Sequence, residues 1–264
     1  EVTLHGLVDR PLTLRYDDLL ERPQVERMIS LSCVSNEVGG HLIGNAVWQG
    51  VLLADVLREA GVRPEAEQVF STSKDGWTCG FPIEAAFDGR DALIAIGMNG
   101  EPLPLRHGFP VRLVVPGLYG YVSATKWLTD IKLTTWADDQ GYWIDKGWSA
   151  LGPIKAQSRI DVPRRSDKVY AGQVVLGGVA WAHRRGVERV EVSIDGGPWL
   201  ETILDTRGNI DTWRQWHYLW EASTGKHEVR VRVTDSTGEV QTSDEAPPDP
   251  DGATGWHTRR ITVR

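Results

Sequence analysis

Residues 98–121 decide the fold of the first half of the chain, and they read MNGEPLPLRHGFPVRLVVPGLYGY. This stretch is the densest in turn-forming residues, and it contains one apolar strand pattern, Val111–Val115. Its glycines let the backbone approach a ligand closely, and His107 and Arg112, with Lys126 downstream, could grip an anion. The pattern predicts an anion-binding rim. Surface loops with ordinary charges are the alternative, and composition alone favours that alternative.

Short helices and strands alternate on both sides of this stretch. Apolar residues recur at helical spacing from Leu52 to Ala60, and Gly61 is placed to end that helix. The other predicted strands are Ile29–Val34, Val69–Ser71 and Ala92–Ile96, and the predicted helical turns are Asp17–Leu20 and Pro82–Ala86. Residues 1–161 are therefore expected to form a mixed α/β domain.

From about Val162 the pattern changes to short strands between turn signals, as in a β-sandwich. Val190–Ile194 alternates apolar and polar residues, and Asp195–Gly197 supplies positions of positive φ for a hairpin. Val229–Val233 alternates in the same way, and the last predicted strand is Arg260–Val263. The sequence thus predicts an α+β protein, with an all-β sandwich over residues 162–264 after a boundary near residues 161–165.

Length and composition bound the class of protein. At 264 residues the chain exceeds the usual ~100–200 of one domain, so two compact units are expected. Hydrophobic residues make up 41% and charged residues 25%, which is typical of a folded globular protein. The net charge of -7 argues against a nucleic-acid partner, because unspecific phosphate binding needs a basic surface. No apolar run approaches the ~20 residues that a membrane helix needs.

Cys33 is the candidate reactive residue. It follows a strand pattern and precedes a turn with two glycines, where a thiol is reachable as a nucleophile or a soft metal ligand. A buried structural thiol or a disulfide with Cys79 is the alternative. A thiol enzyme using Cys33 with His41 as base is a further alternative, although nothing in the sequence would orient that base. The motifs of the common zinc, hydrolase and nucleotide sites are absent.

An ordered set of motifs runs through both predicted domains. In the first they are Asn99–Pro104, His107–Arg112, Val115–Gly117, Gly120 and Lys126–Leu128, and in the second they are Gly178–Trp181, Val190–Trp199 and Trp256-His257. The first set resembles the molybdopterin-binding segments of the sulfite oxidase family, and the second resembles the immunoglobulin-like dimerisation domain of the same enzymes. Cys33 stands where that family keeps its molybdenum cysteine, and Asn45–Val51 resembles the tract that follows.

The resemblance implies a molybdenum-molybdopterin cofactor, with Cys33 as the metal ligand. The implied cofactor-binding residues are Asn36, His107, Arg112, Gly117, Gly120 and Lys126. A thiolate suits a high-valent transition metal, and the cations suit a phosphate tail. The implied activity is two-electron oxygen-atom transfer on a small-molecule substrate, with the cofactor supplying the chemistry. Electrons would pass to a separate protein or an upstream domain, and the Ig-like domain could join two chains into a homodimer.

Two departures from the family pattern bear on the substrate. Asn36 is kept after the cysteine, but Glu37 replaces a basic residue of sulfite oxidases. The late segment that carries a further substrate arginine reads Asp249-Pro250-Asp251-Gly252. An acidic rim would repel a dianion such as sulfite, so a neutral or cationic substrate such as a sulfoxide or an N-oxide is expected.

Three further expectations follow from the resemblance. Trp148 is expected to take the place of an active-site tyrosine, and packing at the seam between the domains is the alternative. The chain starts at Glu1, past the segment that reaches over the pterin in the family. It is therefore expected to be a piece of a longer, extracytoplasmic or membrane-tethered protein. The longer protein is expected to bind the cofactor, and the piece is expected to be incomplete as a cofactor site. A cofactor-free binding or assembly module of such a protein is the alternative function.

Overall fold

The computed structural model describes residues 1–264, which form two compact units. The first unit comprises Glu1–Val34 and Gly44–Pro153, and the second comprises Ser35–Ile43 and Ile154–Arg264. The α+β class is confirmed, because every helix lies in the first unit and every element after Lys146 is a strand. The units divide after Pro153, earlier than the boundary expected near residues 161–165. The reason is that β11 (Gln157–Val162) pairs with β12 (Gly172–Trp181) inside the second unit.

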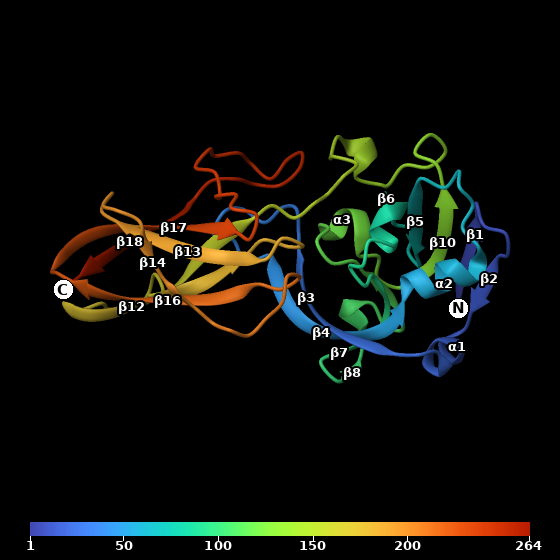
Figure 1. Ribbon diagram of the computed structural model, residues 1–264, viewed down its shortest axis with the longest axis horizontal. Helices are drawn as coiled ribbons and strands as arrows, with labels where there is room; N and C mark the ends of the chain where they lie inside the picture. The colour runs from blue at the N-terminus through green and yellow to red at the C-terminus, as the bar shows by residue number, and fades with distance from the viewer. The chain divides into compact units, whose positions relative to one another are not determined.

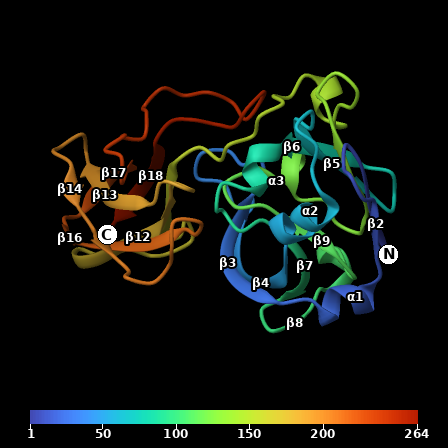
Figure 2. The ribbon, with the colours of Figure 1, turned by 45° about the vertical axis from the view of Figure 1, so that its right-hand side comes forward.

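Two sheets build the first unit. One has the order β2-β1-β10-β5-β6, made of Leu12–Leu14, Val2–Gly6, Leu128–Thr134, Gln68–Ser73 and Thr78–Pro82. The pair β1·β10 is parallel, and the other pairs of this sheet are antiparallel. The other sheet has the order β3-β4-β7-β8, made of Val25–Ser32, Ile43–Leu52, Leu93–Met98 and Glu101–Pro102, with β9 (Arg112–Val114) paired to β7. Figure 2 shows β3 and β4 as two long curved strands.

The helices of the first unit are short. They are α1 (Tyr16–Glu21), α2 (Leu53–Ala60) and α3 (Gly120–Ser123), with 3-10 turns at Ile83–Ala86, Leu105–His107 and Ile144–Lys146. Helix α2 confirms the predicted helix, and its apolar residues Leu53, Val56, Leu57 and Ala60 are all buried. Gly61 ends it in the left-handed conformation at φ 72°, where its N–H donates to the Leu57 carbonyl at 3.1 Å.

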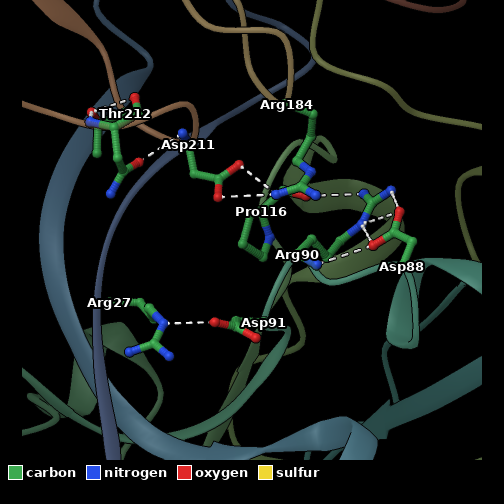
Figure 3. Close-up of polar contacts among 9 residues, drawn as sticks. Arg27, Asp88, Arg90, Asp91, Pro116, Arg184, Asp211 and Thr212 are labelled. Carbon is green, nitrogen blue, oxygen red and sulfur yellow. Dashed lines mark hydrogen bonds and ion pairs between the residues drawn. The ribbon is translucent and has the colours of Figure 1, made fainter.

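Side-chain contacts hold the β3·β4·β7 sheet to its loops. Figure 3 shows Arg27 on β3 paired with Asp91, which lies just before β7, at 2.7 Å. Arg90 pairs with Asp88 and donates to the Pro116 carbonyl at 3.0 Å, so it joins the turn before β7 to the turn after β9. These contacts fix the ends of strands that lead into the candidate site.

Two antiparallel sheets form the second unit, and Figure 1 shows them face to face. One has the order β11-β12-β16-β15 and the other β14-β13-β17-β18. The bounds not yet given are Val187–Ile194 (β13), Leu200–Glu201 (β14), Ile203–Leu204 (β15), Arg214–Ala222 (β16), Gly225–Asp235 (β17) and His257–Val263 (β18). The predicted hairpin is confirmed, with φ 53° at Asp195 and 72° at Gly196. Buried residues from both sheets, Trp216 and Val231 among them, form one core, as in a β-sandwich.

Figure 3 also shows an ion pair of this unit, from Arg184 to Asp211 at 3.2 Å. No helix of the chain has the length and apolar character that crossing a membrane would require.

Candidate functional site

A pocket of about 590 Å³ lies in the first unit. Cys33, Arg112, Gly120 and Lys126 all line it, so the structure brings these predicted site residues together. They come from the end of β3, the start of β9, the start of α3 and the segment between α3 and β10. Segments far apart in the sequence therefore meet at one hollow.

Cys33 is the first residue after β3, and its thiol is free and exposed. The strand ends at the buried Ser32, so the next side chain turns into the pocket. Cys79 is also free, but it is buried, and its sulfur lies 3.1 Å from the Thr125 hydroxyl. Burial raises the pKa of the Cys79 thiol to about 11, which keeps it protonated and unreactive. The predicted alternative of a disulfide between the two cysteines is wrong, since both are free.

Arg112 carries a positive charge that the chain buries without a carboxylate partner. The residue is 6% exposed, and its guanidinium lies 5.0 Å from the ring centroid of Trp48. It donates to the main-chain carbonyls of His107 at 3.0 Å and Ala124 at 3.3 Å. Burial lowers the pKa of Arg112 to about 10. A buried cation that faces a pocket and has only neutral acceptors is suited to an anionic ligand.

Lys126 adds a second cation to the pocket wall. Its ammonium donates to the Arg106 carbonyl at 3.2 Å and lies 4.4 Å from the ring centroid of Trp127. Asp75 lines the same pocket, and hydrogen bonds from the Ser73 hydroxyl and the Trp77 N–H lower the pKa of its carboxyl. The wall thus holds two cations and one anion.

The glycine-rich loop acts through its backbone. Gly108 has φ 107°, and a Cβ atom there would lie 3.0 Å from the Lys126 Cβ and 3.1 Å from the Arg112 Cβ. Only glycine lets the loop pass between these two cationic residues without strain. The ring of His107 does not line the pocket, and burial together with the nearby Arg106 lowers its pKa. Its carbonyl holds Arg112 in place.

Gly117 and Gly120, the two glycines predicted to bind the cofactor, lie in different places relative to the pocket. Gly120 lines the pocket at the start of α3. Gly117 is buried in the turn after β9, at φ 81°, and is not part of the pocket wall. Its predicted role toward a cofactor stays a prediction.

Aromatic side chains form one border of the pocket. Trp143 and Tyr121 line it directly. Trp148 packs on both, with ring centroids 6.3 Å from Trp143 and 5.8 Å from Tyr121. The predicted catalytic residue Trp148 therefore stands behind the pocket wall in the first unit. Trp127 lies inside the motif Lys126–Leu128, and it lines the pocket together with Trp143, although neither residue was assigned a site role from the sequence.

Asn36 and Glu37 belong to the second unit, in the segment Ser35–Ile43. The Asn36 side chain is buried, and its carbonyl oxygen accepts from the Leu42 N–H at 2.7 Å, which closes the loop. Its amide nitrogen has no acceptor in the chain, so a donor remains available there. Glu37 and His41 are exposed.

The residues of the pocket fit a molybdenum-pterin cofactor on physical grounds. A single exposed thiol suits a soft metal whose other ligands come from an organic group. Arg112 and Lys126 supply the charge that a phosphate tail needs, and the buried Arg112 has no acidic partner in the chain. Gly120 lines the pocket, and the absence of a side chain there leaves room for a ligand to approach the backbone.

Comparisons with known proteins agree with this geometry. The family described as the oxidoreductase molybdopterin binding domain matches residues 1–143. The mitochondrial sulfite oxidase of Homo sapiens is 30% identical, and the match covers 89% of this chain and 52% of that protein. The sulfite oxidase of Arabidopsis thaliana is 31% identical, with coverage of 91% and 76%. The chain spans about half the length of the mammalian relatives it matches.

Similarity extends to a solved structure. The sulfane dehydrogenase SoxCD from Paracoccus pantotrophus is similar with a TM-score of 0.84 and 25% sequence identity. The match covers 99% of this chain and 75% of that chain, so it includes both units described above.

Proposed function

Because the chain belongs to the sulfite oxidase family of molybdopterin-binding oxidoreductases, we propose that it catalyses two-electron oxygen-atom transfer on a small substrate. One observation carries the proposal: the exposed Cys33 thiol shares a pocket with the Arg112 guanidinium, which is buried without a carboxylate. The molybdenum-molybdopterin cofactor of this family supplies the oxygen-atom transfer when it is bound. The chain holds that cofactor and shapes what reaches it.

Each pocket residue has a role in this proposal. Cys33 provides the thiolate that ligates molybdenum, and Arg112 and Lys126 bind the anionic end of the cofactor. The carbonyl of His107 orients Arg112, which leaves the remaining N–H groups of the guanidinium free to donate into the pocket. Asn36 is not a pocket residue; its role toward the cofactor is proposed from the family resemblance, and its amide N–H has no acceptor in the chain.

The sequence next to Cys33 disfavours sulfite as the substrate. Glu37 lies four positions after Cys33 in the sequence, where the family resemblance expects a cation. Two like charges about 4 Å apart repel by roughly 4 kcal/mol at the effective dielectric of a protein surface. A neutral or dipolar substrate, such as a sulfoxide or an N-oxide, avoids that penalty.

The role of Trp148 also belongs to the proposal. Its packing against Tyr121 and Trp143 supports a role in shaping the aromatic border of the pocket. A Trp148→Phe variant tests it: a shaping role predicts a higher KM with little change in kcat. An equal loss in kcat and kcat/KM would mean that the indole acts on the transition state instead.

The proposed partners are a separate electron-transfer protein and a second copy of the chain. Val175, Ile203 and Leu219 are exposed apolar residues on one sheet of the sandwich, on strands β12, β15 and β16. Such a face supports pairing through the Ig-like unit. Sedimentation equilibrium measures it: Leu219→Lys should shift a dimer to monomer, and a chain that is monomeric throughout would contradict the pairing.

Molybdenum content per chain tests the proposed function. The protein is produced in a host that makes the cofactor, with molybdate added, and molybdenum is measured by elemental analysis. The parent chain and the control Cys79→Ala should retain the metal, and Cys33→Ala should lose most of its activity and change the electronic spectrum of the centre. Absence of molybdenum from the parent chain would favour the alternative of a cofactor-free binding module.

A further inference from the structure

The backbone at Trp127 is strained. Its φ is 49°, in the left-handed region that bulky residues rarely adopt. The other non-glycine residues with positive φ are Asp91, Asn99, Arg184 and Asp195, and none of them is aromatic. Aspartate and asparagine tolerate this region, whereas a tryptophan there is an outlier. Such strain persists only where the surrounding contacts fix it, and it is concentrated at functional sites.

Contacts on both sides fix Trp127 in this conformation. Its carbonyl accepts from the Lys74 N–H at 2.8 Å. The next residue, Leu128, begins β10 and donates its N–H to the Val111 carbonyl at 3.0 Å. The indole Nε1–H of Trp127 donates to the Leu105 carbonyl at 2.9 Å, which ties the ring to the 3-10 turn that begins there. Main-chain and side-chain contacts therefore hold the strained conformation together.

The left-handed conformation places two neighbouring side chains against each other. In an extended segment, successive side chains point to opposite sides. The φ of Trp127 departs from that geometry, and the Lys126 ammonium lies 4.4 Å from the centroid of the Trp127 ring. A cation over an indole at this distance is attracted by the negative face of the ring. Both residues line the pocket that contains Cys33.

A lysine that is already ordered binds an anion more tightly than a freely moving one. Its long side chain loses conformational entropy when it is fixed. The end of Lys126 is fixed by the Trp127 ring and by a hydrogen bond to the Arg106 carbonyl at 3.2 Å. Because this ordering occurs when the chain folds, it does not weaken the later binding of a ligand. An ammonium has three N–H donors, so the bond to Arg106 leaves others for an anion in the pocket.

We propose that Trp127 is a positioning residue, whose indole ring holds the Lys126 ammonium at the pocket. The strained backbone places the ring beside the preceding side chain, and the bond to the Leu105 carbonyl keeps it there. Trp127 acts through Lys126, to which the proposed function assigns the anionic end of the cofactor. The position of the ammonium is a property of the chain alone, whereas its effect on the cofactor rests on the proposed function.

The position of Lys126 is measured by NMR on the full chain without cofactor. Protons over the face of an aromatic ring are shifted upfield, so the ε-CH₂ signal of Lys126 should lie upfield of that of the exposed Lys168. The signal is assigned by its absence from Lys126→Arg. Trp127→Leu should move it to the ordinary position, while Trp127→Phe, which keeps a ring, should retain part of the shift. The signal of Lys146, whose ammonium lies 4.4 Å from the Tyr142 ring, is the internal control and should not move.

Molybdenum retention measures the effect on the cofactor. Cofactor-loaded protein is dialysed, and molybdenum per chain is followed over time. Trp127→Leu should lose the metal about tenfold faster than the parent, as expected for a lost interaction of about 1.4 kcal/mol. Trp127→Asn should lose it as fast, because asparagine tolerates the left-handed backbone but has no ring. Trp136→Leu, which removes an indole outside the pocket, should retain the metal.

Three results would overturn the inference. They are an ordinary position of the Lys126 signal in the parent chain, a signal that Trp127→Leu leaves in place, and metal retention in Trp127→Asn equal to that of the parent. Both readouts are also obtained with the conservative Trp127→Phe, so the test does not depend on the folding of Trp127→Leu. A parent chain without molybdenum would refute the proposed function instead, and the NMR comparison would then decide the position of Lys126 by itself.

Discussion

Replacing Arg112 by methionine should remove the cofactor while leaving the empty protein folded. The guanidinium is buried in the first unit, stacks on Trp48 and donates to carbonyl groups of His107, Leu113 and Ala124. Methionine has a similar length and keeps the apolar contact with the indole, but it has neither charge nor donors.

In the protein without cofactor, the Arg112→Met substitution has two opposing effects on the free energy of unfolding. The hydrogen bonds to carbonyls are 3.0 to 3.3 Å long, and their loss costs roughly 4 kcal/mol at the lower values for a charged donor. Burial lowers the pKa of Arg112 from 12.5 to about 10, so the folded protein without cofactor is destabilised by about 3 kcal/mol through this buried charge. The uncharged methionine removes that cost. The net loss of stability is therefore about 1 kcal/mol. In the parent chain the anionic end of the cofactor neutralises the buried charge of Arg112. The Arg112→Met variant lacks this interaction and should bind the cofactor about 3 kcal/mol more weakly, which is roughly a hundredfold in affinity.

Urea unfolding and metal analysis measure the two effects separately. The free energy of unfolding is measured on protein from a host that cannot make molybdopterin, and molybdenum per chain on protein from a host that can. Arg27→Met is the matched control, since it removes an exposed pair with Asp91 outside the pocket (Figure 3). It should keep the metal. Full metal content in the Arg112→Met variant, or its failure to fold without cofactor, would show that Arg112 is a purely structural residue.

Other substitutions and conditions test the same site. Gly108→Ala should lower the free energy of unfolding by about 2–3 kcal/mol in urea, against about 1 kcal/mol for Gly100→Ala, which has positive φ but open space around it; equal losses would contradict the close contact. Iodoacetamide at pH 8 should label Cys33 and spare Cys79 until the chain unfolds, as mass spectrometry would show. Because burial raises the folded pKa of Cys79 from 9.0 to about 11, its contribution to stability is complete below pH 9 and should be lost between pH 9 and 11, by up to about 1.4 kcal/mol per pH unit. Cys79→Ala should remove that pH dependence.

Local sequence patterns predicted the elements whose cause is local. Helix α2 is specified by the spacing of its apolar residues and by Gly61, because a glycine adopts without strain the positive φ that commonly ends a helix. The hairpin at Asp195 and Gly196 is likewise specified by residues that tolerate positive φ. Cys33, Arg112 and Lys126 were identified together because ordered motifs resemble a known family, and the structure places them around one pocket.

Long-range packing explains what the sequence could not predict. Trp48 lies beneath the Arg112 guanidinium, a contact between residues 64 positions apart that leaves no local pattern. The segment Ser35–Ile43 belongs to the second unit although it follows a strand of the first. The ring of His257 accepts a hydrogen bond from the Ile160 N–H, which lies 97 positions away. Such contacts exist only once the chain is folded.

The most direct test of the central claim is the molybdenum X-ray absorption spectrum of the cofactor-loaded protein and of its Cys33→Ser variant. If Cys33 ligates the metal, the spectrum of the parent protein indicates one more sulfur atom bound to molybdenum than the spectrum of the variant. The two samples are compared at equal molybdenum content per chain. Identical sulfur shells in the two proteins would contradict the account, because the cofactor would then be held without the thiolate on which the proposed function depends.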